Sequence, residues 1–417
     1  MVGVVFFLTG CSPAGAPTAL STPTPAPTPT SSPALQSLQG TLQPPSVLRL
    51  WLPASMRPDA STPGGSLLAA RIADFEAAHP GLRVDARVKA ESGPGGLREM
   101  LGLAALAAPG SLPDAVALDQ SDLRAASLKQ LLIPLDGSQL AVPVQPTWAP
   151  FARSLSMIDG TFYGLPFAGD CWILVQTQPT ITSPPLWTDL LRWHRNFYAP
   201  LADPKAIFLF SEYLGAGGRL PAGLREVSLD SPALASSLGW LLGLSQAGVL
   251  SSESLQIASS RQALDVLETG GQGAIATFAD YAAASRARSG LSASLPPVPE
   301  GQPLTLVTGW SWAISTSDPQ RQQLATGLVD WLSDPKFLGA WTRAQGLLPA
   351  RVDALSSWPP DAQTQLARAC LSAGVLYPSD EILTTLAPVL SQAARSVLTR
   401  GQDPSQAAAA AINSLRP

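Results

Sequence analysis

The chain has 417 residues, with 26 Lys+Arg and 30 Asp+Glu that give a formal net charge of -4, and 46% of its residues are hydrophobic. This apolar content supports a folded core, and a length above about 300 residues predicts more than one lobe or domain. A mildly acidic chain without a cluster of basic residues lacks the positive face that nucleic acid requires, so we expect no nucleic-acid partner.

The N-terminus carries a membrane signal. No charged residue precedes Arg49, and the apolar residues 2–8 lead into the tetrapeptide LTGC, which ends at Cys11. Such a run is typical of the end of a signal peptide, and the tetrapeptide (8–11) resembles the bacterial lipobox, whose cysteine is acylated and becomes the mature N-terminus. A signal peptide normally carries Lys or Arg before its apolar part, and residues 1–10 contain neither. We therefore predict a signal-peptide remnant at 1–10, a true start upstream that supplies this basic residue, and a lipid on Cys11. The alternative is a chance apolar start.

Residues 12–46 form a second distinct segment. They contain nine prolines and no charge, mixed with Ser, Thr and Ala. This composition cannot bury a core and favours an extended chain of about 3 Å per residue. We interpret the segment as a tether that holds the folded body away from a membrane, so that the protein is extracytoplasmic and anchored to the bacterial cell membrane.

The first part of the body alternates between strand and helix signals. Thr62 and Pro63 supply a hydroxyl cap and a first-turn proline for a helix, and Asp159-Gly160 is a hairpin signal. In chain order we predict a strand at 47–52, a helix from about 63 to 79, a strand at 82–88, a helix at about 95–107, a strand at 114–118 and a helix at about 120–131.

Beyond residue 160 the alternation starts again. We predict a helix from about 187, a strand at 206–210, a helix from about 233, strands at 273–277 and 304–315, and mainly helix to residue 415. Alternating strands and helices predict an α/β fold with a mainly parallel sheet covered on both faces.

Two cysteines remain in the body, Cys171 and Cys370. Outside the cytoplasm they could form a disulfide, but isolated cysteines are more often unpaired core residues. Both interpretations stay open at this point. Neither His79 nor His194 has a cluster of metal ligands around it in the sequence, so we expect no metal and no cofactor.

The order of several motifs resembles a known family. The fragments are LRLWLP, IADFEAAHPGLRVD, LPDAVALDQSDL, DGTFYGLPF, GGQGAIATF, GWSWAIS and VDWLSDPKFLGAWTRAQGLLPAR. Together, behind a lipobox and a tether, they resemble the extracellular solute-binding proteins of ABC importers, in the sugar-binding family that includes maltose-binding protein. The resemblance covers nearly all of residues 47–415.

The resemblance implies a two-lobed periplasmic-binding-protein-like fold whose interleaved lobes are joined by a multi-strand hinge. Lobe one would comprise 47–168 plus 304–352, and lobe two 169–303 plus 353–417. It also implies a monomer that binds a small solute, most simply a mono- or oligosaccharide, in the cleft between the lobes and delivers it to ABC permease subunits.

A sugar site needs flat aromatic faces together with groups that bond hydroxyls. The candidates lie at strand ends, at the implied crossings, or where the family places ligand-contacting residues; they are Trp51, Arg57, Asp119, Asp170, Trp172, Tyr281, Trp310 and Arg351. Ordinary packing is the alternative for each of them.

An enzyme is not expected. Gly309–Ala313 approximates a nucleophile elbow, but its last glycine is replaced, and no histidine follows Ser311 as that hydrolase order requires. The alternatives to a transport receptor are an exported carbohydrate-active enzyme, which would need Asp119 and Asp170 about 5 to 9.5 Å apart, and a sensor that signals without transport.

Overall fold

The computed structural model describes residues 46–135, 147–177, 185–220, 228–299 and 302–416. The chain divides into two units, Met1–Pro44 and Pro45–Pro417, and all of the described residues belong to the second. Cys11 and almost all of the predicted tether lie outside the described residues. None of the described helices combines the length and the apolar character that crossing a bilayer would take.

The strands form one ten-stranded mixed sheet and one separate hairpin, β4–β5. The main order is β2-β1-β3-β10-β6-β8-β7, with β9 and β11 paired to β6 and β12 paired to β10. The strands are β1 (Ser46–Pro53), β2 (Leu82–Lys89), β3 (Ala115–Asp119), β4 (Met157–Ile158), β5 (Thr161–Phe162), β6 (Leu165–Gln176), β7 (Phe197–Tyr198), β8 (Gly273–Thr277), β9 (Ser292–Ser294), β10 (Thr305–Ile314), β11 (Leu348–Pro349) and β12 (Gly374–Leu376).

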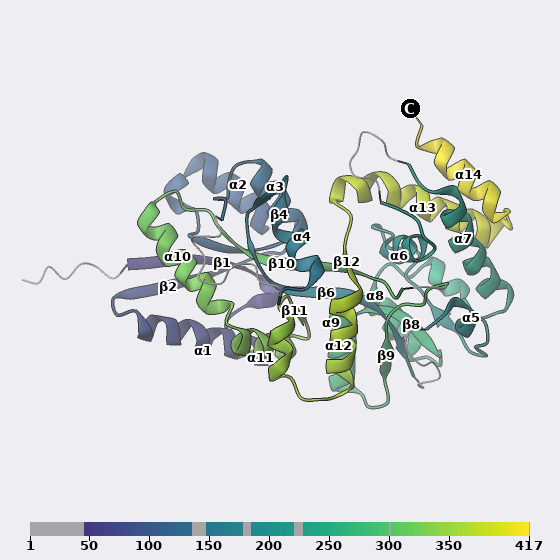
Figure 1. Cartoon of the computed structure of the whole chain (residues 1–417), viewed down its shortest axis with the longest axis horizontal. Coiled ribbons are helices and arrows are strands. Elements are labelled where there is room, and N and C mark those ends of the chain that lie inside the picture. The colour runs from purple at the N-terminus through teal and green to yellow at the C-terminus, as the bar shows by residue number, and fades with distance from the viewer. Residues whose placement is uncertain (1–45, 136–146, 178–184, 221–227, 300–301, 417) are drawn as a thin grey trace, which may run out of the picture. The chain divides into compact units, whose positions relative to one another are not determined.

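Helices cover this sheet in both lobes (Figure 1). They are α1 (Pro63–Ala78), α2 (Leu97–Ala107), α3 (Gln120–Leu128), α4 (Pro150–Ser156), α5 (Trp187–Leu190), α6 (Ile207–Gly215), α7 (Ser231–Gln246), α8 (Ser260–Leu267), α9 (Phe278–Ala287), α10 (Pro319–Leu332), α11 (Pro335–Gln345), α12 (Ala362–Ala373), α13 (Asp380–Arg400) and α14 (Pro404–Ser414).

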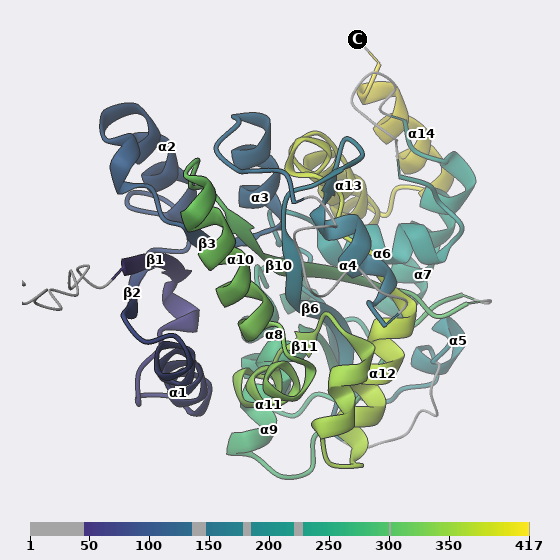
Figure 2. The same ribbon diagram turned by 60° about the vertical axis from the view of Figure 1, so that its left-hand side comes forward.

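The first lobe is built on β1, β2 and β3, which run parallel to one another. Alternate residues of β1 face opposite sides, as strand geometry requires. Leu50 packs with the residues of α1, α10 and α11, whereas Trp51 packs with those of α2 and α3. Figure 2 shows α2 and α3 on one side of the strands and α1 and α11 on the other.

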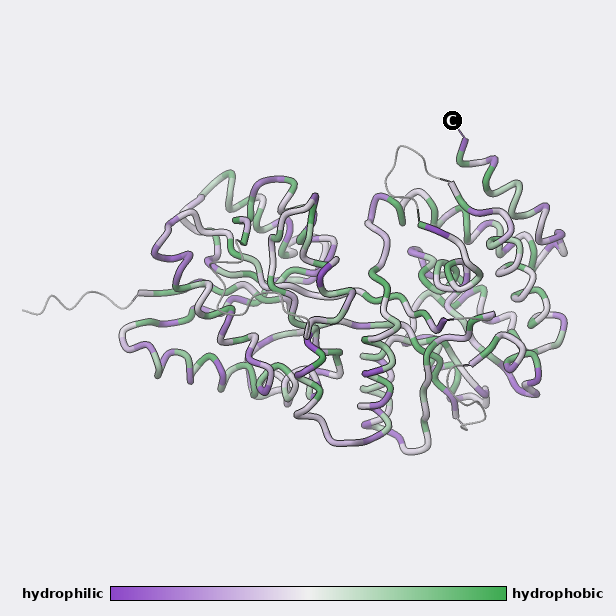
Figure 3. The backbone as a smooth tube through the Cα atoms, viewed as in Figure 1, coloured by the Kyte–Doolittle hydropathy of each residue, from purple (hydrophilic) through white to green (hydrophobic). Residues whose placement is uncertain are grey.

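The second lobe is built on β7, β8 and β9. Helices α6, α7, α13 and α14 contact one another here, while α8 and α9 lie against β8. A separate core cluster fills this helical layer, with Phe208 and Leu386 among its fully buried members. The tube in Figure 3 alternates between hydrophobic and hydrophilic stretches along surface helices such as α1, the pattern of helices that bury one side only.

Strands β6 and β10 join the two lobes. From Leu165 to Cys171, β6 pairs antiparallel with β10, and from Trp172 to Gln176 it pairs with β8 instead. Strand β10 pairs with β3 over Trp310–Ile314 and with β12 over Thr305–Val307. Two backbone segments therefore carry ladder hydrogen bonds in both lobes, whereas the boundaries predicted for the lobes stay a prediction.

Most of the predicted elements are confirmed, but the prediction of a mainly parallel sheet is wrong. Strand β10 pairs antiparallel with β3 and β6, and β6 pairs antiparallel with β8, because the strands shared by the lobes run against their neighbours. Thr62 caps α1 by accepting a hydrogen bond from the Gly65 amide at 3.0 Å, with Pro63 as the first helical residue. Asp159 and Gly160 both have positive φ, at 49° and 84°, as the two-residue turn between β4 and β5 requires.

The strand predicted at 206–210 is wrong, because this segment opens the buried helix α6. The Asp203 carboxylate accepts a hydrogen bond from the Ile207 amide at 3.0 Å, and Ala206 adopts a left-handed φ of 51°, so the chain turns sharply into a helix. A short apolar run fits a buried helix as well as a strand. The strand on this side of β8 is β7, which the sequence pattern did not predict.

Close packing of β6 against β10 predicts intolerance of a side chain at Gly309. A Cβ there would lie 2.7 Å from the Ala168 carbonyl and 2.8 Å from Leu155 Cδ2. Gly309→Ala should lower the free energy of unfolding by about 1–3 kcal/mol in urea denaturation. Gly102→Ala in α2, where a Cβ meets nothing within 4 Å, is the control and should be neutral or stabilising. Equal effects of the two substitutions would show that the contact between β6 and β10 does not require a glycine.

Candidate functional site

A pocket of about 100 Å³ lies where the carboxyl end of β3 and the start of α3 meet the segment that leads into α13. Ligands commonly bind at the carboxyl ends of parallel strands. Here side chains of both lobes line the pocket. The lining residues are Arg98, Asp119, Gln120, Ser121, Arg124, Ala125, Lys205, Thr308, Tyr377, Pro378, Ser379, Asp380, Glu381 and Leu383.

Asp119 is held rigidly at one wall of this pocket. It is the last residue of β3 and the N-cap of α3, and its carboxylate accepts a hydrogen bond from the Asp122 amide at 2.8 Å. The Ser121 hydroxyl donates to the same oxygen at 3.3 Å. A capping carboxylate retains free lone pairs, so Asp119 can still accept a hydrogen bond from a ligand hydroxyl.

Gln120 connects the two lobes directly. Its Nε2 donates a hydrogen bond to the Tyr377 carbonyl at 2.8 Å, across 257 residues of sequence. Its Oε1 is buried and has no hydrogen-bond partner among the described residues. Because a buried polar atom normally has a partner, this oxygen is an unsatisfied acceptor beside the pocket.

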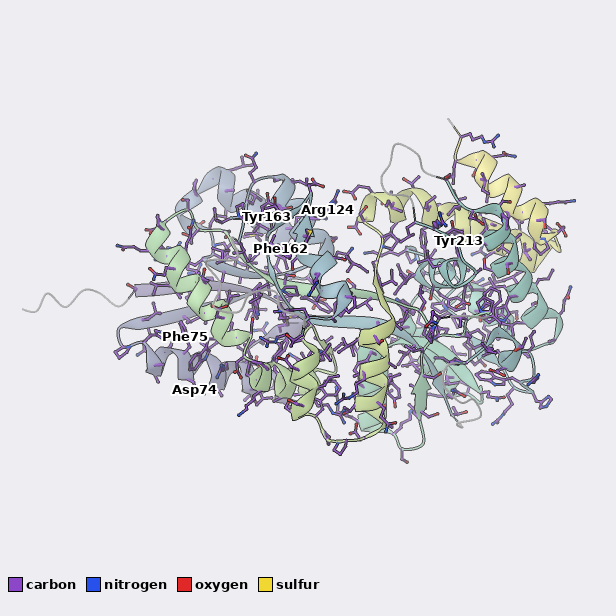
Figure 4. The ribbon with its side chains drawn as sticks, in the orientation of Figure 1. Asp74, Phe75, Arg124, Phe162, Tyr163 and Tyr213 are labelled. Carbon is purple, nitrogen blue, oxygen red and sulfur yellow. The ribbon has the colours of Figure 1, made fainter. Side chains whose placement is uncertain are left out.

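The charges around the pocket are balanced. Arg124 Nε lies 3.8 Å from Glu381 Oε2 across the two lobes, and Lys205 Nζ lies 3.5 Å from Asp380 Oδ1. Figure 4 labels Arg124 on α3, on the side of the first lobe that faces α13. These pairs are partly exposed, so each contributes little to stability, and the pocket suits a neutral, polar solute.

Asp122 lies just behind this wall. Burial, together with the negative charges of Asp119 and Asp380, raises its pKa to about 6, although the Arg98 guanidinium 3.6 Å away opposes the shift. The carboxyl of Asp122 is therefore close to half-protonated in mildly acidic solution.

Asp170 lies on β6 opposite Thr308, beside the point where the strand changes partner. Its carboxylate accepts a hydrogen bond from the Ala279 amide, near the start of α9, at 3.0 Å. Burial raises the pKa of Asp170 to about 7, against the opposing hydrogen bonds from Ala279 and Thr277. The group therefore changes charge near neutral pH.

Tyr377 links Asp170 and Trp172 to the pocket. The Trp172 indole N–H donates a hydrogen bond to the Tyr377 hydroxyl, and Trp172 itself is only 6% exposed. Burial, followed by the charge of Asp170, raises the pKa of the Tyr377 hydroxyl well above its usual range. Tyr377 thus lines the pocket and also contacts the strand shared by the lobes.

The other aromatic candidates do not line this pocket. Trp51 is 3% exposed among α2 and α3 residues, with Lys89 Nζ 4.6 Å from its ring centroid. Tyr281 is 6% exposed and belongs to the main core cluster, against which the partly buried Trp310 also packs. Their ligand contacts stay predictions.

The two arginine candidates have protein partners. Arg57 is exposed and forms an ion pair with Asp59 at 3.6 Å. Arg351 is buried and donates two hydrogen bonds to Asp353, at 3.0 and 2.6 Å, with its guanidinium 5.6 Å from the Trp148 ring centroid. Of the eight predicted ligand residues, the pocket contains Asp119 alone, and Asp170 and Trp172 adjoin it through Tyr377.

Sequence reasoning missed most of the pocket wall. The missed residues include Arg98, Arg124, Lys205, Tyr377 and Glu381. Residues 379–381, Ser-Asp-Glu, carry the chemistry of a helix start and could have marked the beginning of α13. Nothing in the sequence shows that this start meets α3. No group of three potential metal ligands occurs among the described residues.

Comparison with solved structures shows the fold. The unliganded maltodextrin-binding protein of L. casei BL23 matches with a TM-score of 0.71 at 14% identity, over 89% of this chain and 97% of that one. The GacH receptor of Streptomyces glaucescens, solved unliganded and with acarbose, matches with 0.64 at 16% identity over 89% and 97%. UgpB of Mycobacterium tuberculosis, solved with glycerophosphocholine, matches with 0.65 at 16% over the same shares.

These likenesses define the chain as an α/β protein of the two-lobed periplasmic-binding-protein-like class. The family model of the bacterial extracellular solute-binding proteins matches residues 70–368, and the chain belongs to this family. An extracytoplasmic location follows, and the family and the structural neighbours are binding proteins of ABC importers. The comparison with curated proteins gives no match.

The raised pKa of Asp170 predicts a pH-dependent stability. The protonated carboxyl is favoured in the folded protein, where the pKa is about 7 rather than 3.8. Its stabilising contribution is therefore fully present below about pH 4 and is lost as the pH rises through 7. Between pH 4.5 and 8, Asp170→Asn should remove on the order of 1–3 kcal/mol of this decline, measured by urea denaturation.

The exposed Asp85, which pairs with Arg87 on β2, provides the control. Asp85→Asn should retain the pH slope of the wild-type protein. An unchanged slope in Asp170→Asn would show that the carboxyl does not titrate near neutrality.

Proposed function

We propose that the protein is a lipid-anchored receptor that binds a saccharide between its lobes and delivers it, as a monomer, to the permease subunits of an ABC importer. One observation carries this proposal: the pocket is walled by both lobes. Gln120 and Arg124 of α3 face Tyr377, which precedes α13, and Glu381, which lies in its first turn. A solute held there contacts both walls simultaneously.

Binding would then be coupled to the arrangement of the lobes. A solute that contacts both walls stabilises the arrangement in which they are close, so its binding shifts an open–closed equilibrium. The backbone segments β6 and β10, which pair in both lobes, restrict this motion to a hinge. The permease can distinguish the loaded receptor from the empty one by this difference in arrangement.

The wall chemistry supports a hydroxyl-rich solute. Asp119 can accept hydrogen bonds, Arg98 and Lys205 can donate them, and Tyr377 supplies an aromatic ring. Sugar hydroxyls both donate and accept, so they match such a mixed set. Acarbose and α-D-tagatose are bound in two of the structural neighbours, which is consistent with this proposal.

Anchoring is supported by the sequence alone. The lipobox-like LTGC ends at Cys11, and the proline-rich residues 12–46 follow it. Two or more acyl chains on one residue give durable membrane attachment, because each buried methylene contributes about 0.8 kcal/mol. The tether then lets the receptor reach the permease in the same membrane.

A solute screen tests the proposed function. In thermal-shift measurements against mono- and oligosaccharides, amino acids and polyol phosphates, we expect a saccharide to raise the melting temperature of the protein. Small-angle scattering of that complex should give a smaller radius of gyration than the free protein. Tight binding without compaction would contradict the two-walled site, and binding of another class alone would contradict the saccharide assignment.

Asp119 provides the mutational test of the pocket. Asp119→Asn retains a side chain that can cap α3 but removes the charge at the pocket wall. It should weaken binding of the solute found in the screen by about 1.5–3 kcal/mol in calorimetry, the range for a hydrogen bond to a charged group. Asp85→Asn should bind normally, and normal binding by both variants would place the ligand elsewhere.

Cys11 provides the test of anchoring. When the gene is expressed from its own locus, Cys11→Ser should move most of the protein from the membrane fraction to the soluble fraction, because the acyl chains are lost. Ser32→Ala in the tether is the control and should stay with the membrane. A membrane-bound Cys11→Ser variant would show that something other than this cysteine holds the protein there.

A further inference from the structure

Cys171 and Cys370 are both free thiols and are both completely buried in the main core cluster. Cys171 lies on β6 and Cys370 on α12, 199 residues apart in sequence. The proposed function uses neither of them. Their positions relative to the strands shared by the lobes suggest a role.

Cys171 occupies the point at which β6 changes partner. It is opposite Val307 and is the last β6 residue to pair with β10, and its neighbour Trp172 is the first to pair with β8. Relative motion of the lobes must be accommodated around this position, because the strand belongs to a different ladder on either side of it.

Cys370 lies close to the same position, on the helix that precedes β12. Its helix α12 leads directly into β12, whose Gly374 pairs with Thr305 of β10. A Cβ on Gly374 would lie 2.9 Å from the Cys370 carbonyl and 2.8 Å from a methyl group of Val307, the residue opposite Cys171. The Cys370 thiol and the Thr305 side chain are close enough to the Cys171 thiol to shift its pKa. The two sulfur atoms are therefore neighbours in a closely packed region.

We propose that Cys171 and Cys370 are an oxidation site. In the exported protein they form a disulfide that links α12 to β6 at the residue where this strand changes partner, and the disulfide restrains the two elements against each other. Both cysteines are unpaired in this structure. The inference rests on the extracytoplasmic location of the family and not on the identity of the solute.

The chemistry balances through thiol–disulfide exchange. One cysteine thiolate attacks the disulfide of an oxidised protein disulfide donor, and the second cysteine displaces the donor from the mixed disulfide. Two protons and two electrons leave the cysteines, and the donor is released as a dithiol. Oxidising compartments outside the cytoplasm maintain such donors.

The reaction belongs to folding and not to the folded state. Burial and the neighbouring Cys370 thiol raise the pKa of the Cys171 thiol well above its usual range, so little nucleophilic thiolate is available once the core has formed. During folding both thiols are accessible, and the native packing then holds them side by side. The finished bond closes a loop of about 200 residues, a length for which constraint of the unfolded chain is strong.

Peptide mapping tests the proposal on the full chain exported to the periplasm of a bacterial host. Free thiols are blocked with N-ethylmaleimide under denaturing conditions before digestion. We expect most molecules to yield one peptide pair linked through Cys171 and Cys370. Alkylation of both cysteines in most molecules would overturn the proposal, and so would a bond that joins either of them to another chain.

Melting temperature tests the restraint itself. Reductant should lower the melting temperature of the wild-type protein by several degrees and leave the Cys171→Ala/Cys370→Ala double variant unchanged. Alanine is chosen because a buried serine would leave a hydroxyl without a partner. If the linked peptide is present and reductant does not change the melting temperature, the disulfide forms but does not restrain β6 against α12, and this second part of the proposal is wrong. These measurements contain no solute, so their failure leaves the proposed function untouched.

Discussion

The backbone pairing of β6 is the constraint on which the rest of the structure depends. One continuous strand donates and accepts ladder hydrogen bonds in the first lobe up to Cys171 and in the second lobe from Trp172 onward. Buried backbone groups must be paired, so neither lobe can complete its sheet without this strand. The lobes are consequently inseparable at the sheet.

This pairing places polar and aromatic side chains beside the residue at which β6 changes partner. Asp170 and Trp172 flank Cys171, and they bond respectively to the start of α9 and to the Tyr377 hydroxyl. Tyr377 is in turn a wall of the pocket, and its carbonyl accepts the Gln120 side chain from the first lobe. The pocket wall, the contact between the lobes and the change of strand partner thus belong to one connected set of groups, so a change at one affects the others.

Many of the residues that could bind a solute already have packing or ion-pair partners in the protein. Tryptophans that a sugar site could use, such as Trp51, fill the core of one lobe instead. Charged residues at the pocket wall already pair with each other, as Arg124 does with Glu381. A solute bound in the proposed site would therefore have to compete with these contacts, which favours a ligand that offers several hydrogen bonds over a ligand that offers one charge.

The sequence by itself determined the alternation of strands and helices, the Asp159-Gly160 hairpin, the capping of α1 and the strand-end position of Asp119, because these depend on local periodicity and turn chemistry. It could not determine that residues 206–210 open a helix, since an apolar run buried on all sides has no periodicity that separates helix from strand. Only the tertiary structure decided that Gln120 meets Tyr377, that Trp51 and Tyr281 turn into the core, and that Cys171 meets Cys370. Each of these contacts joins segments far apart in the chain or selects one face of an element. Such choices depend on how whole elements pack, and no local pattern encodes them.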